Sequence, residues 1–404
     1  MANVYGPKII RDGLVLYLDK YNERSYLGEP TTNLVYYTNL DGGWSKGYNT
    51  DIVWNGITGP VGVDSPVVGF REGYSSNGTG YWYSYGDYCP QDPSTTYSVS
   101  MYVKTNSPNN VNLAFYTADN TETGRYWSGY LAVTASDGWK RLIWPNFTSA
   151  SNAQSDSLSF YYYGLGTGAT GSRLWLCAPQ MEEKVHATKF IPAANNGTTT
   201  TRSSTDGWRD LSGYSNHADL STLTYTATNV PNANTNNFYF DGATEYCDLP
   251  TLTSGSVKTI TAWIKADVNH SGIVFGPHVN GHDNWFGVES RLINVFATQS
   301  ADTNNFSANG VTYMDNDGWY YIAVTINYAD KTVKCYLNGV VENSVTRTHT
   351  IGDWGGGAAT IGRRGTISQR YFNGEIDTTS IYNRVLTASE ILQNFNAHKG
   401  RYGL

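Results

Sequence analysis

The sequence has few charged residues, no long apolar run and no paired cysteine motif. Asp, Glu, Lys and Arg together make up 15% of the 404 residues, and 18 apolar residues never run together. The absence of a long apolar run argues against a membrane-spanning helix. The opening MANVYGPKIIRDG also has no charged region followed by an apolar one, as a signal peptide would. We therefore expect a chain that is made in the cytoplasm and stays soluble, without a membrane partner.

Charge and cysteine usage argue against nucleic-acid binding and against a cysteine-based zinc or redox site. The formal net charge is −7, the sequence pI is about 5.5 and no Lys/Arg-rich run occurs, so nucleic acid is not an expected partner. The four cysteines stand singly, without a C-x-x-C motif, which argues against a zinc site or a redox pair: Cys89, Cys177, Cys247 and Cys335. We expect Cys335, which alternates with Val333 and Leu337, to be a small buried side chain.

Strand and turn residues are abundant instead. The chain holds 42 Gly and 32 Tyr, and aromatic residues make up 14% of it. YSVSMYVKT at 97–105 and the later ASDGWKRLIW form a strand pair, and the same pattern returns in KTITAWIKAD at 258–267 and DNDGWYYIAV at 315–324. We therefore predict an all-β protein with two β-sandwich (jelly-roll) domains, although such a repetition also arises by chance in β-rich sequence.

One hairpin and one helix stand out near the C-terminal end. Asn338-Gly339 lies between two apolar strands, which is a strong hairpin signal. In VLTASEILQNFNAHKG, Thr387 and Glu390 form a capping-box pattern and Gly400 is placed to end the helix. We expect this helix to pack against the last sandwich.

Six segments resemble the laminin-G-like, concanavalin A-like lectin domains in order and spacing: FYFDGATEYCDLP, TITAWIKAD, GWYYIAVTI, KCYLNG, ATIGRR and FNGEIDTTSIYNRVLTASEI. The last is the most specific. In this family the first strand lies well upstream, followed by a turn-rich segment. The resemblance implies that this strand is within 13–26 and that its continuation is Trp208 to Leu220. The domain would then be discontinuous, comprising residues 1–30 and 198–404.

The intervening segment, 31–197, begins with TTNLV and contains ATKFIP near its end. It resembles the carbohydrate-binding-module-like jelly rolls inserted in tailed-phage virion structural proteins, and GPKIIRDGLVLYLD resembles the start of such proteins. This implies a virion location after synthesis in the host cytoplasm, with other virion proteins as partners. A homo-oligomer is expected, although no coiled-coil heptads occur. Residues 1–12 are a candidate attachment arm.

A catalytic function finds little support. Glucanases of the concanavalin A-like fold deliver their paired carboxylates from a Glu-x-Asp-x-(x)-Glu strand. The nearest match is Glu375-Ile376-Asp377, which lacks a third carboxylate. No G-x-S-x-G motif occurs either, and the seven scattered His residues do not suggest a metal site. We predict that the protein is not an enzyme.

A calcium site has one candidate pair of ligands. Asp283 and Asn284 stand where the pentraxin branch of the resembled superfamily has an Asp-Asn pair, and calcium prefers such oxygen ligands. The rest of that site would follow ATIGRR, where Arg363 and Arg364 replace the expected acids and amides. We therefore expect no cofactor, and keep calcium at Asp283 and Asn284 as the alternative to an ordinary turn.

Sugar binding without metal would use exposed aromatic rings that stack on pyranose C–H groups. GYWYSYGDY at 80–88 is the densest cluster, and Trp82, Tyr83 and Tyr85 are the predicted carbohydrate-binding residues, with Tyr83 and Tyr85 partly exposed and Trp82 packed inside. FYYYG at 160–164 and the loop 281–286 are further candidates. The competing interpretation is core packing.

The sequence thus predicts a non-enzymatic bacteriophage virion protein, displayed on the particle as a fibre, adhesin or decoration component, whose lectin-like domains bind host-surface polysaccharide. The first alternative is a purely structural capsid cement or neck protein that binds no sugar. The second is a secreted accessory of a bacterial glycan hydrolase, which the missing signal peptide disfavours. Because sandwiches of this kind host unrelated activities, the choice has to come from the sites.

Overall fold

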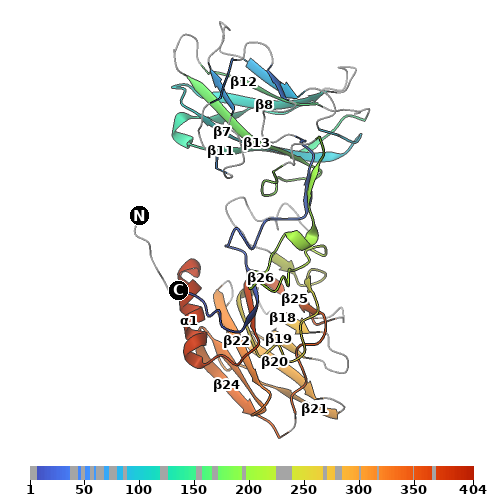
Figure 1. Ribbon diagram of the computed structural model, residues 1–404, viewed down its shortest axis with the longest axis vertical. Helices are drawn as coiled ribbons and strands as arrows, with labels where there is room; N and C mark the ends of the chain where they lie inside the picture. Colours follow the sequence, from blue (N-terminus) through green and yellow to red (C-terminus); the bar gives the residue numbers. More distant parts are fainter. Residues whose placement is uncertain are drawn as a thin grey trace. The chain divides into compact units, whose positions relative to one another are not determined.

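The chain divides into two compact units, one inserted into the other (Figure 1). Unit 1 comprises Met1–Pro30 and Ser203–Leu404, and unit 2 comprises Thr31–Arg202. The structure, a computed structural model, describes residues 7–36, 44–46, 51–54, 59–60, 68–71, 80–84, 89–118, 126–151, 157–165, 172–192, 197–223, 239–266, 271–277, 284–299, 302–315, 318–348, 350–365 and 370–404. Within these ranges no helix is long and apolar enough to span a membrane.

Unit 1 is built on two antiparallel sheets. In its described part, one sheet has the order β1-β26-β17-β22-β23-β24, with β15 also paired to β26, and the other has the order β16-β25-β18-β19-β20-β21. The strands are β1 (Leu14–Asp19), β15 (Tyr239–Asp241), β16 (Cys247–Leu249), β17 (Thr259–Ala266), β18 (Gly272–Pro277), β19 (Trp285–Glu289), β20 (Leu292–Gln299), β21 (Asp302–Ser307), β22 (Trp319–Asn327), β23 (Thr332–Leu337), β24 (Val340–Thr346), β25 (Ala359–Ile361) and β26 (Asn373–Tyr382).

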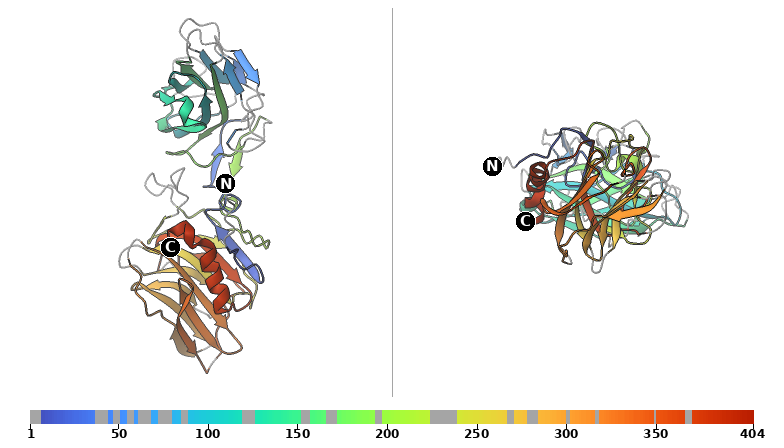
Figure 2. Two further views of the ribbon diagram at one scale, coloured as in Figure 1. Left: turned by 90° about the vertical axis from the view of Figure 1, so that its left-hand side faces the viewer. Right: turned by 90° about the horizontal axis from the view of Figure 1, so that it is seen from below.

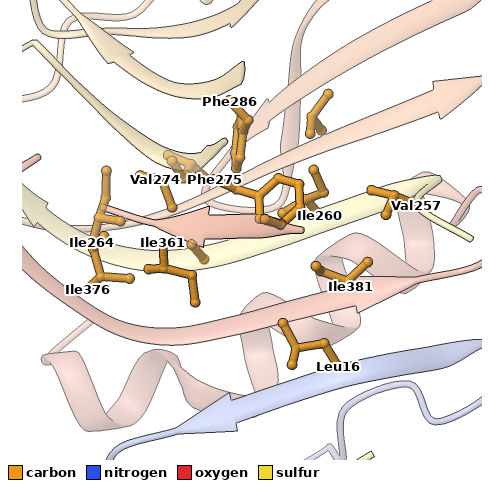
Figure 3. Close-up of a cluster of buried hydrophobic side chains, with 14 of the residues drawn as sticks. Leu16, Val257, Ile260, Ile264, Val274, Phe275, Phe286, Ile361, Ile376 and Ile381 are labelled. Atoms are coloured by element: carbon orange, nitrogen blue, oxygen red, sulfur yellow. The ribbon is translucent and has the colours of Figure 1, made fainter. Parts of the chain in front are cut away.

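The N-terminal strand β1 belongs to the first of these sheets. Leu16 pairs with Ile381 of β26, and Figure 3 shows the two strands side by side with both side chains in the apolar cluster. Ile260 of β17 joins them, and Phe275 and Phe286 come from the second sheet. The prediction that the segment 13–26 pairs in the sheet system of the C-terminal part is confirmed for β1.

The turn-rich segment Trp208–Leu220 lies along β1, as expected. The Tyr17 amide donates to Asp210 Oδ1 (2.8 Å), and the Leu211 amide donates to the Tyr17 carbonyl (2.9 Å). Trp208 is fully buried and forms isolated bridges with Tyr26 and Ala218. A turn-rich stretch with no strand just before it therefore finds its partner far upstream in the sequence.

Helix α1 (Ala388–His398) covers the outer face of the sheet that contains β26 (Figure 2). Ile391 packs in one cluster with Trp263 and Tyr382 of that face. The predicted capping box is confirmed, because the side chain of Thr387 accepts a hydrogen bond from the Glu390 amide. The predicted end at Gly400 is wrong: α1 passes into the 3-10 helix η3 (Lys399–Tyr402), and Gly403 takes the left-handed conformation instead.

Residues 8–12 are held on the same helix. Asn394 Oδ1 accepts from the Ile10 amide (2.8 Å), and Gln393 Nε2 donates to the Lys8 carbonyl (2.8 Å). Arg384 forms an ion pair with Asp12 (2.8 Å). Residues 8–12 are therefore held on unit 1, and attachment through residues 1–12 remains a prediction.

Unit 2 is a second antiparallel sandwich. In its described part, one sheet has the order β10-β8-β12-β6-β3, with β9 paired to β8, and the other has the order β11-β7-β13-β5-β4; β14 pairs with β2. The elements are β2 (Thr31–Asn33), β3 (Trp44–Lys46), β4 (Asp51–Trp54), β5 (Val68–Arg71), β6 (Gly80–Ser84), β7 (Thr96–Thr105), β8 (Val111–Ala118), β9 (Tyr126–Trp127), β10 (Leu131–Val133), β11 (Lys140–Thr148), β12 (Ser157–Tyr163), β13 (Arg173–Glu182) and β14 (Thr200–Arg202), with 3-10 turns η1 (Ala135–Asp137) here and η2 (Ser204–Asp206) in unit 1.

The core of unit 2 follows the period-2 alternation of its strands. Phe115 of β8 and Leu158 and Phe160 of β12 point into one buried cluster, together with Met101 of β7 and Leu174 of β13 from the other sheet. The residues between them, such as Tyr116 and Tyr161, therefore lie on the opposite face. The predicted all-β class with sandwich domains is confirmed.

Candidate functional site

Five aromatic side chains gather on the outer face of the β8–β12 sheet of unit 2. This aromatic patch consists of Tyr116, Trp127, Tyr130, Tyr161 and Tyr163. It lies on the face opposite the core, because Phe115, Phe160 and Tyr162 of the same strands are buried. The exposed fractions are 48% for Trp127, 46% for Tyr130 and 39% for Tyr163, whereas Tyr116 and Tyr161 are half-buried.

The rings contact one another across three strands. Trp127 of β9 stands opposite Tyr116 of β8, and their rings stack at 5.3 Å with an interplanar angle of 19°. Tyr161 of β12 meets Trp127 edge-on at 5.5 Å. Tyr130 and Tyr163 form a second edge-on pair at 4.9 Å. Partial burial, together with Tyr161 and Tyr163, raises the pKa of Tyr130 above its ordinary value.

A short hydrogen-bonded connection positions Trp127 and Tyr130. The Ser128 amide donates to the Phe115 carbonyl (3.0 Å), and the Phe115 amide donates to Ser128 Oγ (2.8 Å). Trp144 Nε1 then donates to the Gly129 carbonyl (2.8 Å). The two exposed rings therefore project from a backbone that is tied to the core strands, and a ligand would not need to order it.

Two small side chains lie beside the rings on the same face of the sheet, and one of them is polar. Ala114 and Ser159 pair with Tyr161 and Tyr116 across β8 and β12 and are almost fully buried. Among the described residues, the Ser159 hydroxyl has no hydrogen-bond partner. The patch thus combines ring faces with tyrosine hydroxyls and carries no formal charge. Such a surface suits ligands with apolar C–H faces and hydroxyl groups.

For two of the predicted binding residues, Trp82 and Tyr83, the structure describes the backbone next to this surface. β6 pairs with β12, where Trp82 stands opposite Phe160 and Tyr83 opposite Ser159. The side chains of Trp82 and Tyr83, and the whole of Tyr85, lie outside the described residues. Their role in binding, and their predicted exposure, remain predictions.

The second sequence candidate, FYYYG at 160–164, is divided between the two faces. Phe160 and Tyr162 are core residues, whereas Tyr161 and Tyr163 belong to the patch. Sequence analysis missed Tyr116, Trp127 and Tyr130. Trp127 and Tyr130 flank a Ser-Gly pair, and aromatic residues on both sides of such a pair are a usable signal. The partnership of β9 with β8, however, is a tertiary contact.

In unit 1, the candidate calcium ligand Asn284 is buried and hydrogen-bonded. Its Nδ2 donates to the Asp353 carbonyl (2.8 Å). Asp283 lies outside the described residues. The guanidinium carbons of Arg364 and Arg370 lie 4.7 and 4.8 Å from the ring centre of the next residue, Trp285. Within the described ranges, no group of three His, Cys, Asp or Glu side chains is arranged to hold a metal.

The carboxylates nearest to a glucanase pattern, Glu375 and Asp377, each face a lysine. Lys265 Nζ lies 3.9 Å from Glu375 Oε1, and Lys20 Nζ lies 3.6 Å from Asp377 Oδ1. The Asp377 side chain has no exposed surface, because a bulge in the β17–β26 pairing between Ile376 and Thr378 sets it inside the fold. A substrate in solution therefore has no access to Asp377.

Comparison with known proteins identifies the fold of unit 1. Residues 240–392 match the family described as the concanavalin A-like lectin/glucanases superfamily. That range is similar to this superfamily and runs from Phe240 of β15 into α1. No curated protein matches the sequence.

Three solved structures that are similar to part of the chain have low sequence identity to it. The binding domain of Paraclostridial mosquitocidal protein 1 is 15% identical, with a TM-score of 0.39, and the match covers 47% of this chain and 49% of that one. Domain 4 of AbnA, a GH43 extracellular arabinanase from Geobacillus stearothermophilus, is 18% identical, with a TM-score of 0.36 and coverages of 46% and 92%. A heptameric pentraxin from Limulus polyphemus is 19% identical, with a TM-score of 0.32 and coverages of 38% and 78%. The chain thus spans about half the length of the toxin domain.

Proposed function

We propose that this chain is a non-enzymatic glycan-binding protein that a bacteriophage particle displays on its surface, as a fibre, adhesin or decoration component. Other virion proteins hold it there, it assembles with copies of itself, and its ligand is a host-surface polysaccharide. The virion setting rests on the sequence resemblance of the insert and of the first strand. Glycan binding rests on the aromatic patch of unit 2, and the superfamily match of unit 1 supports a lectin-like function.

The patch carries the proposal because soluble proteins seldom leave contiguous rings exposed. Trp127, Tyr130 and Tyr163 each expose more than a third of their surface although they contact other rings. A contiguous exposed apolar area marks an interaction site more often than a single exposed ring does. Rings that are fixed in advance also lose little conformational freedom when a ligand binds.

The chemistry of the patch selects a neutral sugar. Its side chains are uncharged, so they offer no counter-ion to a carboxylate or a phosphate. Ring faces instead accept the C–H face of a pyranose, and the hydroxyls of Tyr130, Tyr161 and Tyr163 can exchange hydrogen bonds with the sugar hydroxyls. We therefore assign the patch to uncharged stretches of a polysaccharide.

The test compares Trp127→Ala and Tyr163→Ala with the wild type in calorimetric titrations against neutral host-surface polysaccharide fragments. Loss of a ring contact worth about 0.5–1.5 kcal/mol should weaken binding roughly 2- to 12-fold for each variant. The melting temperature should change little, because both side chains are substantially exposed.

Tyr313→Ala is the matched control, since Tyr313 is 63% exposed on unit 1. It should bind like the wild type. If the wild type binds no fragment, or if the patch variants bind unchanged, the patch is not a glycan site. Particles that fail to incorporate the Trp127→Ala protein would then favour the purely structural virion protein, with the patch as a protein interface.

A further inference from the structure

A lysine and an aspartate from opposite ends of the chain meet inside unit 1. Lys20 follows β1, and its amide donates to the Asp377 carbonyl (3.1 Å), which fixes the two backbones side by side. The side-chain atoms Nζ and Oδ1 are 3.6 Å apart, and neither side chain has any exposed surface. The Tyr26 ring lies 5.9 Å from Nζ and adds to the apolar surroundings.

The Asp377 carboxylate is poorly satisfied for a buried anion. Neither of its oxygens has a hydrogen-bond partner among the described residues. Buried carboxylates normally accept several hydrogen bonds, because an unsatisfied charge in the interior is costly. Burial raises the pKa of Asp377 to about 6, and the negative charge of Glu375 adds to this effect against the attraction of Lys20.

The pKa of the Lys20 amine is shifted in the opposite direction, downward. Burial lowers the pKa of Lys20 to about 7, although the charges of Asp377 and Glu375 oppose this shift. Near neutral pH a fraction of the molecules therefore holds an uncharged amine beside an uncharged carboxylic acid. These are the reactive forms for amide formation, since the amine needs its lone pair and the acid needs a hydroxyl leaving group.

We propose that Lys20 and Asp377 condense into an intramolecular isopeptide bond that joins the end of β1 covalently to β26. The Nζ lone pair attacks Asp377 Cγ and forms the C–N bond. The C–OH bond then breaks, and one proton from the amine leaves with the hydroxyl as water. The products are one secondary amide and one water molecule, without any oxidant or cofactor.

Glu375 is the proton-transfer group of this reaction. It lies two residues before Asp377 on β26, and its charge acts on both reacting groups. A carboxylate in this place can accept the amine proton and return it to the leaving hydroxyl. The fold supplies proximity, because the backbone hydrogen bond holds the two groups together in a site closed to water.

The neighbouring pair Lys265 and Glu375 shows why burial matters. Its side chains are 31% and 15% exposed, and its atoms are 3.9 Å apart. Both side chains keep some contact with water there, unlike those of Lys20 and Asp377. The inference goes beyond the proposed function and does not depend on it, since the bond concerns unit 1 whether or not unit 2 binds a glycan.

Mass spectrometry of the purified full chain tests the proposal. The expected intact mass is lower than the sequence mass by one water, and a tryptic digest should contain one peptide in which Lys20 is linked to Asp377. Trypsin should not cleave after Lys20. Lys20→Met and Glu375→Gln should restore the full mass, whereas Lys265→Met should keep the loss of water.

A wild-type protein at full mass that is cleaved after Lys20 overturns the inference, and this result does not depend on whether any variant folds. A loss of water that persists in Lys20→Met also overturns it, because the dehydration would then lie elsewhere. A wild-type protein that has lost one water but contains unlinked Lys20 overturns the inference as well. A linked peptide in Glu375→Gln at wild-type yield would remove Glu375 from the reaction.

Discussion

Acidification should destabilise unit 1 through His398, at the end of α1. The ring is 7% exposed, and Nε2 lies 3.3 Å from the Tyr17 hydroxyl, which itself donates to Asp19 Oδ2 (2.6 Å). Because the tyrosine proton is used for Asp19, Nε2–H donates to the tyrosine oxygen. Arg401 binds the same carboxylate at 2.9 Å. A proton on His398 would thus be buried close to a fixed cation.

The size of this pH effect follows from the difference in the pKa of His398 between the folded and the unfolded protein. Burial first, and then Arg401, lower the pKa of His398 from 6.5 to about 4, against the attraction of Asp19. The folded pKa is depressed, so this contribution to stability is complete above pH 6.5 and is lost as the pH falls through about 4. The difference corresponds to about 3 kcal/mol in the free energy of unfolding. The last turn of α1 favours a cation by only about 0.3–1 kcal/mol, so burial dominates.

His398→Gln removes the titration and keeps a donor for the Tyr17 hydroxyl. We expect the variant to be about 1 kcal/mol less stable at pH 7, because it loses ring packing. As the pH falls to 4, the wild type should lose about 3 kcal/mol more than the variant, so their stability curves should cross near pH 5 to 6. Urea denaturation at several pH values measures the curves, and the range from pH 7 to 9, where they should run parallel, is the control. Parallel curves down to pH 4 would refute the reasoning.

Three further outcomes are expected. Gly276→Ala should destabilise unit 1 by about 3 kcal/mol in chemical denaturation, because its Cβ would lie 2.4 Å from the Arg363 carbonyl oxygen and 2.5 Å from the Gly365 nitrogen. Calcium or a chelator should leave the melting temperature unchanged; a rise with calcium that Asp283→Ala and Asn284→Ala abolish would instead establish those ligands. Purified protein should release no reducing ends from β-glucans or host polysaccharide, and a release that Glu375→Gln abolishes would contradict the non-enzymatic proposal.

The sequence was informative wherever local chemistry determines the structure. The alternation of β17 and β22, the Asn338-Gly339 turn and the capping box at Thr387 all specify their elements from neighbouring residues. That β1 pairs within the sheets of the C-terminal part was predicted only through the family resemblance, because no periodicity indicates a partner so far away in the sequence. Its pairing with β26 is known only from the structure. Gly400 was chosen as the helix end on residue type, but the chain turns at Gly403, where the 3-10 segment ends.

The type of candidate site, a surface of aromatic rings, was predictable from the sequence, but only some of its residues were. Aromatic richness in strands pointed to ring stacking, and Tyr161 and Tyr163 lie in a stretch that the sequence singled out. Which tyrosines face outward depends on the register of β12 against β8, and register is set by the core residues of both strands. Trp127 joins the patch only because β9 pairs with β8. A single sequence contains neither fact.

The Glu375-Ile376-Asp377 stretch illustrates how a motif acquires its chemistry from its surroundings. In a glucanase the same spacing would present both carboxylates to a cleft, where water and sugar can enter. Here the bulge at Asp377 sets that carboxylate inside the fold, and Lys20 arrives from β1 to face it. An acid that no solvent substrate can reach has only the chain itself as a reaction partner. The buried amine at 3.6 Å is the nucleophile that the fold supplies, so condensation within unit 1 replaces hydrolysis of a ligand as the chemistry open to these residues.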